Sequence, residues 1–212
     1  ETEQHNERVV IRAIKVGEKL GLSMSELDEL KIASGLHDIG KIGISDDILS
    51  KSTSLTDEEY EIIKTHTEKG YRIIKASSEL KSVAKSVLYH HERWDGNGYP
   101  MGLKGEEIPL LARIISVCDT FDVMISGRVY KSAMSKKSAL EELKRCAGTQ
   151  FDPKVVDIFI DLYTVNNAFS VIKVENYADK EPIVVEGMLR SGKDDGNSHG
   201  IGIKSINNSL SK

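Results

Sequence analysis

The segment HHERWDGNGYPMGLKGEEIPLLARII, residues 90–115, predicts two helices and the loop that joins them. Its middle part, residues 95–105, holds four glycines and one proline, and both residue types interrupt helices. The paired His90 and His91 therefore lie where one helix ends, and the next helix begins near residue 106. Two adjacent imidazoles at a helix end can point at one metal ion or at two neighbouring ions.

Outward from this segment, apolar residues recur at helical spacing from the start of the chain to about residue 166. Val9, Val16 and Leu20 belong to one such stripe. Thr56, followed by three acidic residues, is a typical helix N-cap. We expect helices at residues 3–20, 25–38, 56–75, 79–92, 106–126, 135–147 and 153–166. The predicted fold class is therefore all-α, a helical bundle.

The sequence changes character after Asn167. Short β-branched runs at residues 171–174 and 183–185 precede the glycine-rich stretch SGKDDGNSHGIGIKSI, residues 191–206, which leads into a predicted final helix. We therefore expect a helical domain at residues 1–166 and a small αβ tail at residues 167–212. A tail of this size buries too little apolar surface to fold easily alone.

Composition excludes several classes of protein. The 212 residues carry a formal net charge of −4, which argues against a surface for duplex nucleic acid. No apolar stretch approaches the roughly 18 residues of a membrane span. Two cysteines and no signal peptide predict a cytoplasmic protein. Because the chain starts at Glu1 rather than Met, we expect an upstream sensor or receiver domain.

Histidines and aspartates occur in patterns that metal chemistry uses. His37 and Asp38 stand in LHDIGK, His66 in KTHTEKG and Asp119 in VCDTFD. Imidazole and carboxylate donors suit transition metals, and the lack of cysteine ligands argues against a closed zinc site. An aspartate can also bridge two metals through its two oxygens. The alternative is that each histidine is a partly buried polar residue, and the dipeptide HD is common by chance.

Further charged residues could have a role in function or could simply be exposed to solvent. Glu1 and His5 are four residues apart, so a helix would present both on one face. Lys41, one turn beyond His37, is placed to hold a phosphate oxygen. In SGRVYKS, Arg128 and Lys131 would hold a second phosphate, and Tyr130 would pack on a sugar or base. The alternatives are a frayed helix start, a surface lysine and a solvated helix end.

Together with residues 90–115, the segments HDIGKIGISDDILSK, HTEKGYRII and CDTFDVMISGRVYK resemble the HD-GYP subgroup of the HD phosphohydrolase superfamily. The match runs from residue 1 to about residue 163. The resemblance implies an all-helical domain with two or three divalent transition metals, Fe or Mn. It also implies hydrolysis of the bacterial messenger cyclic di-GMP to pGpG and sometimes onward to GMP. The alternatives are another cyclic or linear dinucleotide as substrate, or a non-catalytic sensor of cyclic di-GMP.

The resemblance also assigns roles to residues. The implied metal ligands are Glu1, His5, His37, Asp38, His66, His90, His91 and Asp119. Asp38 is the implied bridge, Lys41 the catalytic lysine, and Arg128 and Lys131 the phosphate-binding pair. The loop residues Gly98, Tyr99 and Pro100 are expected to shape the pocket and to contact a protein partner. Val129 and Val123 depart from the usual pattern, which puts substrate affinity in doubt more than chemistry.

The tail resembles the last part of a histidine-kinase-type ATPase domain, in which HGIGIKSI, residues 199–206, would be a glycine motif near the nucleotide phosphates. That domain's asparagine-bearing helix and its aspartate–glycine motif are not evident in this chain. We therefore expect a remnant of such a domain that binds no ATP. His199 is not a metal candidate.

Overall fold

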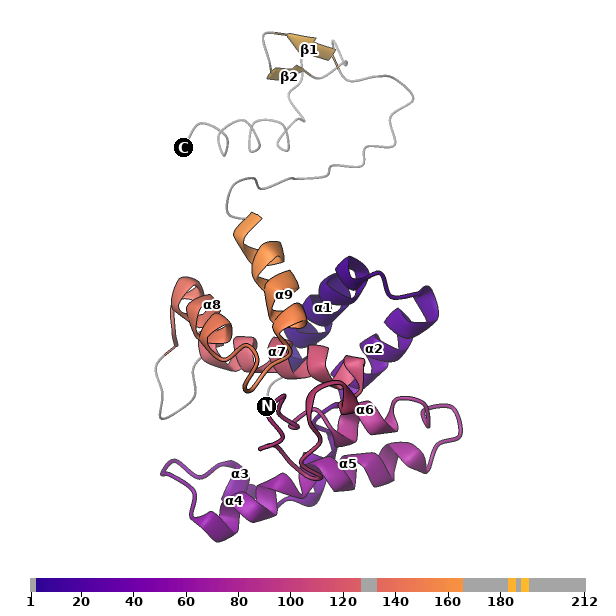
Figure 1. Ribbon diagram of the computed structural model, residues 1–212, viewed down its shortest axis with the longest axis vertical. Coiled ribbons are helices and arrows are strands. Elements are labelled where there is room, and N and C mark those ends of the chain that lie inside the picture. Colours follow the sequence, from indigo (N-terminus) through magenta and orange to yellow (C-terminus); the bar gives the residue numbers. More distant parts are fainter. Residues whose placement is uncertain (1–2, 127–132, 166–182, 186–187, 191–212) are drawn as a thin grey trace, which may run out of the picture. The chain divides into compact units, whose positions relative to one another are not determined.

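The computed structural model describes residues 3–126, 133–165, 183–185 and 188–190 (Figure 1). The chain divides into two compact units, residues 1–170 and 171–212, and each is described by itself. The described residues of the first unit form helices and connecting loops, and no strand. Its elements are α1 (Glu3–Leu20), α2 (Met24–Leu36), the 3₁₀ helix η1 (Ile39–Gly43), α3 (Asp46–Leu49), α4 (Asp57–Lys64), α5 (His66–Lys75), α6 (Ala84–Leu88), the 3₁₀ helix η2 (Gly105–Glu107), α7 (Leu110–Ser126), α8 (Lys136–Arg145) and α9 (Pro153–Val165).

Helix α7 is the centre of the first unit. It contacts α1, α2, α6, α8 and α9, and it runs through the middle of the bundle in Figure 1. The side chains of Ile114, Val117 and Phe121 on α7 are fully buried. Phe121 meets Phe159 of α9 edge to face, with 4.9 Å between ring centroids. Helix α7 therefore packs against helices from the N-terminal and the C-terminal parts of the domain's sequence. Its polar residues can contact side chains that are far away in the sequence.

Local sequence explains where several helices begin. Ser23 and Glu26 form a capping box at the start of α2, in which each side chain binds the other residue's backbone N–H. Thr56 and Glu59 form the same arrangement at the start of α4. Helix α7 begins after Pro109, which has no N–H to donate and is therefore tolerated only at a helix start. The helix predicted at 106–126 thus begins at residue 110, after the short turn of η2.

Two predicted helices need correction. The helix predicted at 56–75 is two helices, α4 and α5, that meet at Thr65. The Thr65 hydroxyl donates to the carbonyl of Ile62 at 2.6 Å, which tightens the last turn of α4. Gly40 of η1 packs so closely on this junction that a Cβ there would overlap the carbonyl oxygen of His66. The helix predicted at 79–92 is much shorter in the structure: only residues 84–88 are α-helical.

The second unit is described only in part. Strand β1 (Ile183–Val185) pairs antiparallel with β2 (Met188–Arg190), with residue 184 opposite residue 189. Strand β1 coincides with the predicted run at 183–185. The run predicted at 171–174, the final helix and the domain boundary at residue 166 lie outside the described residues. The division at that boundary stays a prediction.

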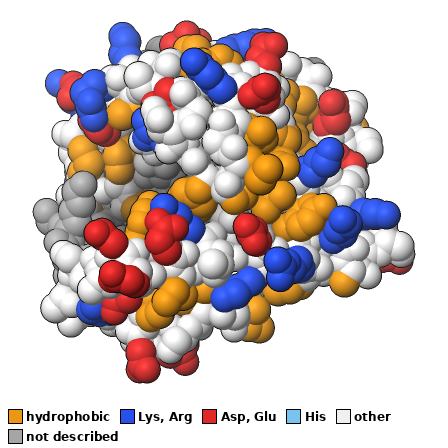
Figure 2. Space-filling view, turned by 60° about the horizontal axis from the view of Figure 1, so that its bottom comes forward, with side chains coloured by type: hydrophobic (Ala, Val, Ile, Leu, Met, Phe, Trp, Pro, Cys, Tyr) orange, Lys and Arg blue, Asp and Glu red, His pale blue; other side chains and the backbone are white. Residues whose placement is uncertain are grey.

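The surface of the first unit mixes charges of both signs. Figure 2 shows one face, on which basic and acidic side chains lie side by side among apolar ones. Among the described residues, no helix combines the length and the apolar composition needed to cross a bilayer.

Candidate metal centre

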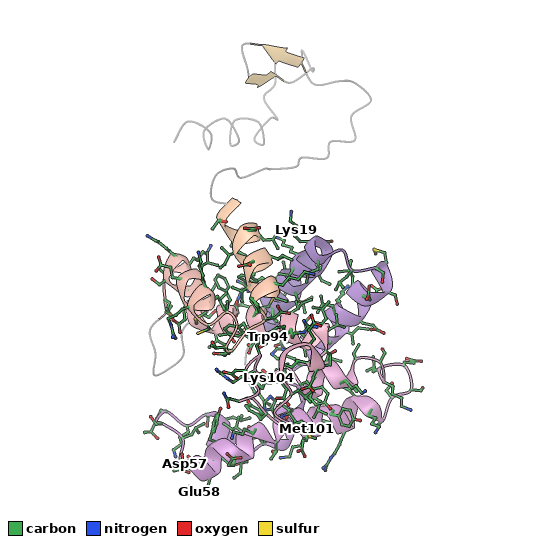
Figure 3. The ribbon with its side chains drawn as sticks, in the orientation of Figure 1. Lys19, Asp57, Glu58, Trp94, Met101 and Lys104 are labelled. Carbon is green, nitrogen blue, oxygen red and sulfur yellow. The ribbon has the colours of Figure 1, made fainter. Side chains whose placement is uncertain are left out.

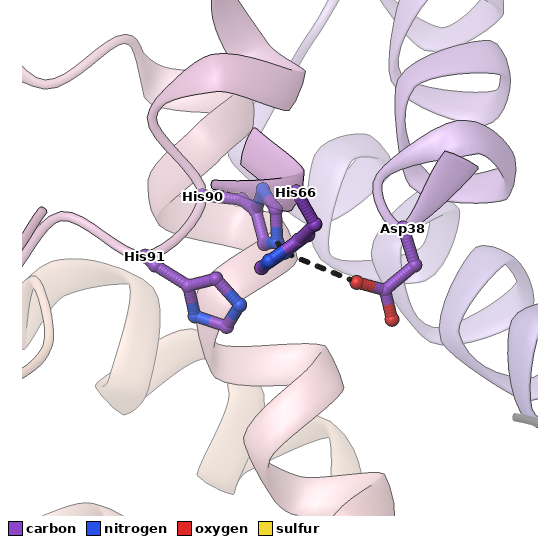
Figure 4. Close-up of side chains that lie close together, drawn as sticks. All are labelled: Asp38, His66, His90 and His91. Carbon is purple, nitrogen blue, oxygen red and sulfur yellow. Dashed lines mark hydrogen bonds and ion pairs between the residues drawn. The ribbon is translucent and has the colours of Figure 1, made fainter. Parts of the chain in front are cut away.

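Four predicted ligands form a first group, drawn in Figure 4. They are Asp38, just after α2, His66 at the start of α5, and His90 and His91, just after α6. One donor atom from each lies within 4.8 Å of the others. His66 Nε2 is 3.3 Å from Asp38 Oδ1 and 3.4 Å from His90 Nε2. Four donors at these distances could hold a metal ion.

Three more predicted ligands form a second group. His5 comes from α1, His37 follows α2, and Asp119 lies on α7. His5 Nε2 is 3.3 Å from Asp119 Oδ1, and His37 Nε2 is 3.9 Å from the same oxygen. Helix α7 is far from α1 and α2 in the sequence, so the group forms because both of these helices pack on α7.

Asp38 joins the two groups. Its Oδ1 lies 3.3 Å from His66 Nε2 in the first group, and its Oδ2 lies 3.3 Å from His37 Nε2 in the second. The two oxygens of one carboxylate therefore each face one group. This is the placement that a carboxylate needs to bind two metal ions at once.

Helix ends orient three of the histidines. The Nδ1 atoms of His37, His66 and His90 lie 2.8, 2.6 and 2.6 Å from the carbonyl oxygen three residues earlier. A carbonyl oxygen only accepts, so each Nδ1 carries the hydrogen and donates it. These carbonyls belong to the last turns of α2, α4 and α6, where the regular ladder of helical hydrogen bonds ends. The bond turns each Nε2 toward the centre and raises its basicity as a ligand.

Electrostatics also favour a cation. Burial lowers the pKa of His66, and it lowers that of His90 to about 3, so both imidazoles are neutral donors near pH 7. Burial opposes charge on His37 as well, but the carboxylates of Asp38 and Asp119 outweigh it and raise the pKa of His37 to about 9. The carboxylates of Asp38 and Asp119 thus favour a proton on His37. His37 Nε2 is buried and makes no hydrogen bond among the described residues. The donor set fits divalent transition metals, which would take the place of that proton.

Lys41 lies beside the shared carboxylate. Its Nζ is 2.8 Å from Asp38 Oδ2. A pocket of about 250 Å³ opens there, lined by Asn6, Gly35, Asp38, Ile39, Lys41 and Ile42. The close packing of Gly40 on α5 fixes the position of η1, and with it Lys41. A ligand in this pocket would meet an ammonium group next to the two donor groups.

Sequence reasoning missed the residues that hold His5. Asp122 is fully buried, and its carboxylate accepts hydrogen bonds from His5 Nδ1 at 2.7 Å, from Arg8 Nε and Nη2 at 2.7 Å each, and from Arg12 Nη1 at 2.6 Å. Although burial raises the pKa of Asp122, these donors hold it well below its usual range. Asp122 follows Asp119 by three residues, and Arg8 follows His5 by three. Those two spacings, each one helical turn, were the available signal.

Other predicted residues are placed or lie outside the described ranges. Of the predicted loop residues, Tyr99 contacts the first group, with its ring stacked on His91, and Gly98 lies against the backbone of residues 92–93. No contact of Pro100 with the first group is seen among the described residues. The predicted Glu1, Arg128, Tyr130 and Lys131 lie outside the described residues, and so does His199.

A family model described as an HD domain matches residues 2–155. The chain belongs to the HD domain family. A protein of Thermotoga maritima named cyclic di-GMP phosphodiesterase is 45% identical over 164 residues, which cover 76% of this chain and 45% of that protein. A protein of Vibrio cholerae named 3'3'-cGAMP-specific phosphodiesterase 2 is 39% identical over 163 residues, covering 76% of this chain and 31% of that protein. The chain therefore spans less than half the length of these relatives.

Solved structures agree on the fold of the HD domain. An HDG"Y"P protein from Bdellovibrio bacteriovorus aligns with a TM-score of 0.61 at 20% identity, over 76% of this chain and 51% of that one. The predicted superfamily and the predicted all-α fold of the HD domain are thus confirmed. A second family model, described as a GHKL domain, matches residues 147–212 and agrees with the predicted likeness of the tail to an ATPase domain.

Proposed function

We propose that the HD domain of this chain is a metal-dependent phosphodiesterase that hydrolyses cyclic di-GMP to pGpG. The observation that carries the proposal is the carboxylate of Asp38, which faces one donor group with each oxygen and Lys41 with Oδ2. The choice of substrate is supported by the relative from Thermotoga maritima, which is named for this activity. Resemblance to the GYP subgroup points the same way.

The proposed ligands fall into two groups that share one residue. Asp38, His66, His90 and His91 would hold one metal, and His5, His37, Asp119 and the second oxygen of Asp38 would hold another. Divalent metals bound there would lower the pKa of water and polarise a phosphate ester. We propose Fe or Mn, because a mixture of imidazole and carboxylate donors suits both. Glu1 is the proposed ligand of a third metal.

The chain's own residues would position and stabilise the substrate. Lys41 would offset the negative charge that develops on the phosphoryl oxygens, since its ammonium lies next to Asp38 at the pocket. Asp38 in turn holds the lysine in place. Arg128 and Lys131 are proposed to bind the second phosphate of the cyclic dinucleotide, and Tyr130 to pack on a sugar or base. Loss of Arg128 would then raise KM more than it lowers kcat.

A second substrate is favoured by one observation. The Vibrio cholerae relative is named for 3'3'-cGAMP and is 39% identical over most of the HD domain. The two cyclic dinucleotides share their phosphodiester linkages and differ in one base. The chemistry at Asp38 and Lys41 would be the same for both, so only contacts to the base would decide between them.

Turnover of a substrate panel tests the proposal. The protein is loaded with Fe(II) without oxygen, or with Mn(II), and is given cyclic di-GMP, 3'3'-cGAMP or linear pGpG. We expect pGpG from cyclic di-GMP, and the linear substrate shows whether GMP follows. Faster turnover of 3'3'-cGAMP would support the second substrate. Binding of cyclic di-GMP without any product, by folded and metal-loaded protein, would make the chain a sensor and overturn the proposal.

A further inference from the structure

His91 is oriented differently from the other histidines of the first group. His66 and His90 each donate Nδ1–H to a carbonyl of the preceding helix end. No such bond holds His91 among the described residues. Its imidazole instead stacks on the ring of Tyr99, with 4.9 Å between ring centroids and 28° between ring planes. The ring of Tyr99 thus packs on one face of His91, whereas His66 and His90 are each held by a carbonyl at Nδ1.

The loop that carries Tyr99 is fastened to the residues around His91. Tyr99 N donates to the carbonyl of His91 at 3.3 Å. The next residue, Glu92, is 3% exposed, and its carboxylate accepts hydrogen bonds from Met101 N at 2.7 Å and Leu103 N at 3.0 Å. At residue 98 the backbone passes so close to residues 92–93 that a Cβ would overlap it. The loop is therefore attached to the backbone that directly follows the histidine pair.

The base of the loop is closed as well. Asp95 and Lys104 form an antiparallel bridge, and Gly105 N donates to the carbonyl of Trp94 at 3.0 Å. Figure 3 labels Met101 and Lys104 of this loop, and Trp94, which directly precedes it. Met101 is 67% exposed. It offers a control position in the same loop.

A cation from a separate helix lies near the same aromatic ring. Lys64 of α4 places Nζ 5.6 Å from the ring centroid of Tyr99, within the range of a cation–π contact. Tyr99 thus contacts His91 of the first group and a side chain of α4. A displacement of the loop would remove the ring from both.

We propose that residues 95–105 are a positioning element of the metal centre: the ring of Tyr99 orients His91, so that loop conformation and metal affinity are coupled. The inference rests on His91 being a metal ligand, as proposed above. Residues that orient a ligand usually change metal affinity by about 10- to 100-fold when they are lost. Coupling is reciprocal, so whatever displaces the loop weakens the metal, and metal binding stabilises the loop.

The test measures Mn(II) affinity by competition with a chelator, in variants of the whole chain. Tyr99→Ala is expected to weaken one Mn(II) by about tenfold or more. Tyr99→Phe keeps the ring and is expected to retain affinity within about twofold. Met101→Ala is the matched control in the same loop and is expected to leave affinity unchanged. Thermal unfolding of each variant shows that the domain remains folded.

Substitution of His91 separates failure of this inference from failure of the proposed ligand set. If His91→Ala leaves Mn(II) affinity unchanged, His91 is not a ligand and the assignment above is wrong. If His91→Ala weakens Mn(II) and Tyr99→Ala does not, the ligand stands and the coupling is overturned. We expect both to weaken the same Mn(II), and Tyr99→Ala to add no loss in the His91→Ala background. Additive losses, or a Tyr99→Phe variant as weak as Tyr99→Ala, would also overturn the coupling.

Discussion

The two donor groups of the metal centre are held by different kinds of structure. In the first, His66 and His90 are fixed by carbonyls of the helices they follow, three residues away. In the second, His5 is fixed by Asp122, which lies 117 residues away and is held by two arginines. The orientation of His66 and His90 thus depends on local structure, whereas that of His5 depends on the packing of α1 on α7. The halves should therefore respond differently to substitution.

Asp38→Ala should have the largest effect, because it removes the residue that both groups share. We expect turnover to fall by roughly 10³-fold or more and Mn(II) stoichiometry to fall as well. In Asp38→Asn, which keeps the shape of the side chain and loses its charge, turnover should fall nearly as far. The measurement is kcat together with metal content. A variant that keeps near-normal kcat would show that Asp38 bridges nothing.

Gly40→Ala tests the backbone packing behind the first group. A Cβ at residue 40 would overlap the carbonyl of His66 and approach Gly70 N to 2.5 Å, so η1 must shift away from α5. We expect the free energy of unfolding, measured in urea, to fall by about 3 kcal/mol or more.

Gly43→Ala is the control for that substitution. Its new Cβ would meet the side chain of Lys69 at 2.9 Å, and a lysine side chain can move. A loss under about 1 kcal/mol is expected. Equal losses at residues 40 and 43 would contradict the view that packing of η1 on α5 holds the first group.

Asp122→Asn should affect the second group and spare the first. The amide keeps the size of the side chain but weakens its bonds to His5, Arg8 and Arg12. We expect one Mn(II) to bind about 10- to 100-fold more weakly while the other is unchanged. Asp157→Asn, at an exposed position of α9, is the control. Equal weakening of both ions would mean that the two halves are one cooperative unit.

The contrast between local and long-range contacts also explains which site residues could be predicted from the sequence. His37, His66 and His90 stand at helix ends, where residue type and local pattern suggest the site before any packing is known. Asp122 could not be chosen in this way, because a carboxylate on a buried helix gains its role only when α1 brings His5 and the arginines to it.

The errors in the predicted helices have the same origin. The break between α4 and α5 lies where Gly40 of a different segment packs on the helix, and the apolar spacing of 56–75 contains no sign of this contact. The stacking of Tyr99 on His91 depends on how the loop folds back on residues 92–93. Local periodicity predicts helices well, but it does not report such contacts.

Glu1→Gln should have the smallest effect, confined to a third metal next to the second group. Glu1 and His5 are four residues apart, so a helix that continued α1 backward would present both on one face. We expect metal content above two per chain at saturating Mn(II), and a fall of up to one in Glu1→Gln, with the two tighter ions and kcat nearly unchanged. Equal metal content in the unsubstituted protein and in Glu1→Gln would show that the centre is dinuclear and that Glu1 is not a ligand.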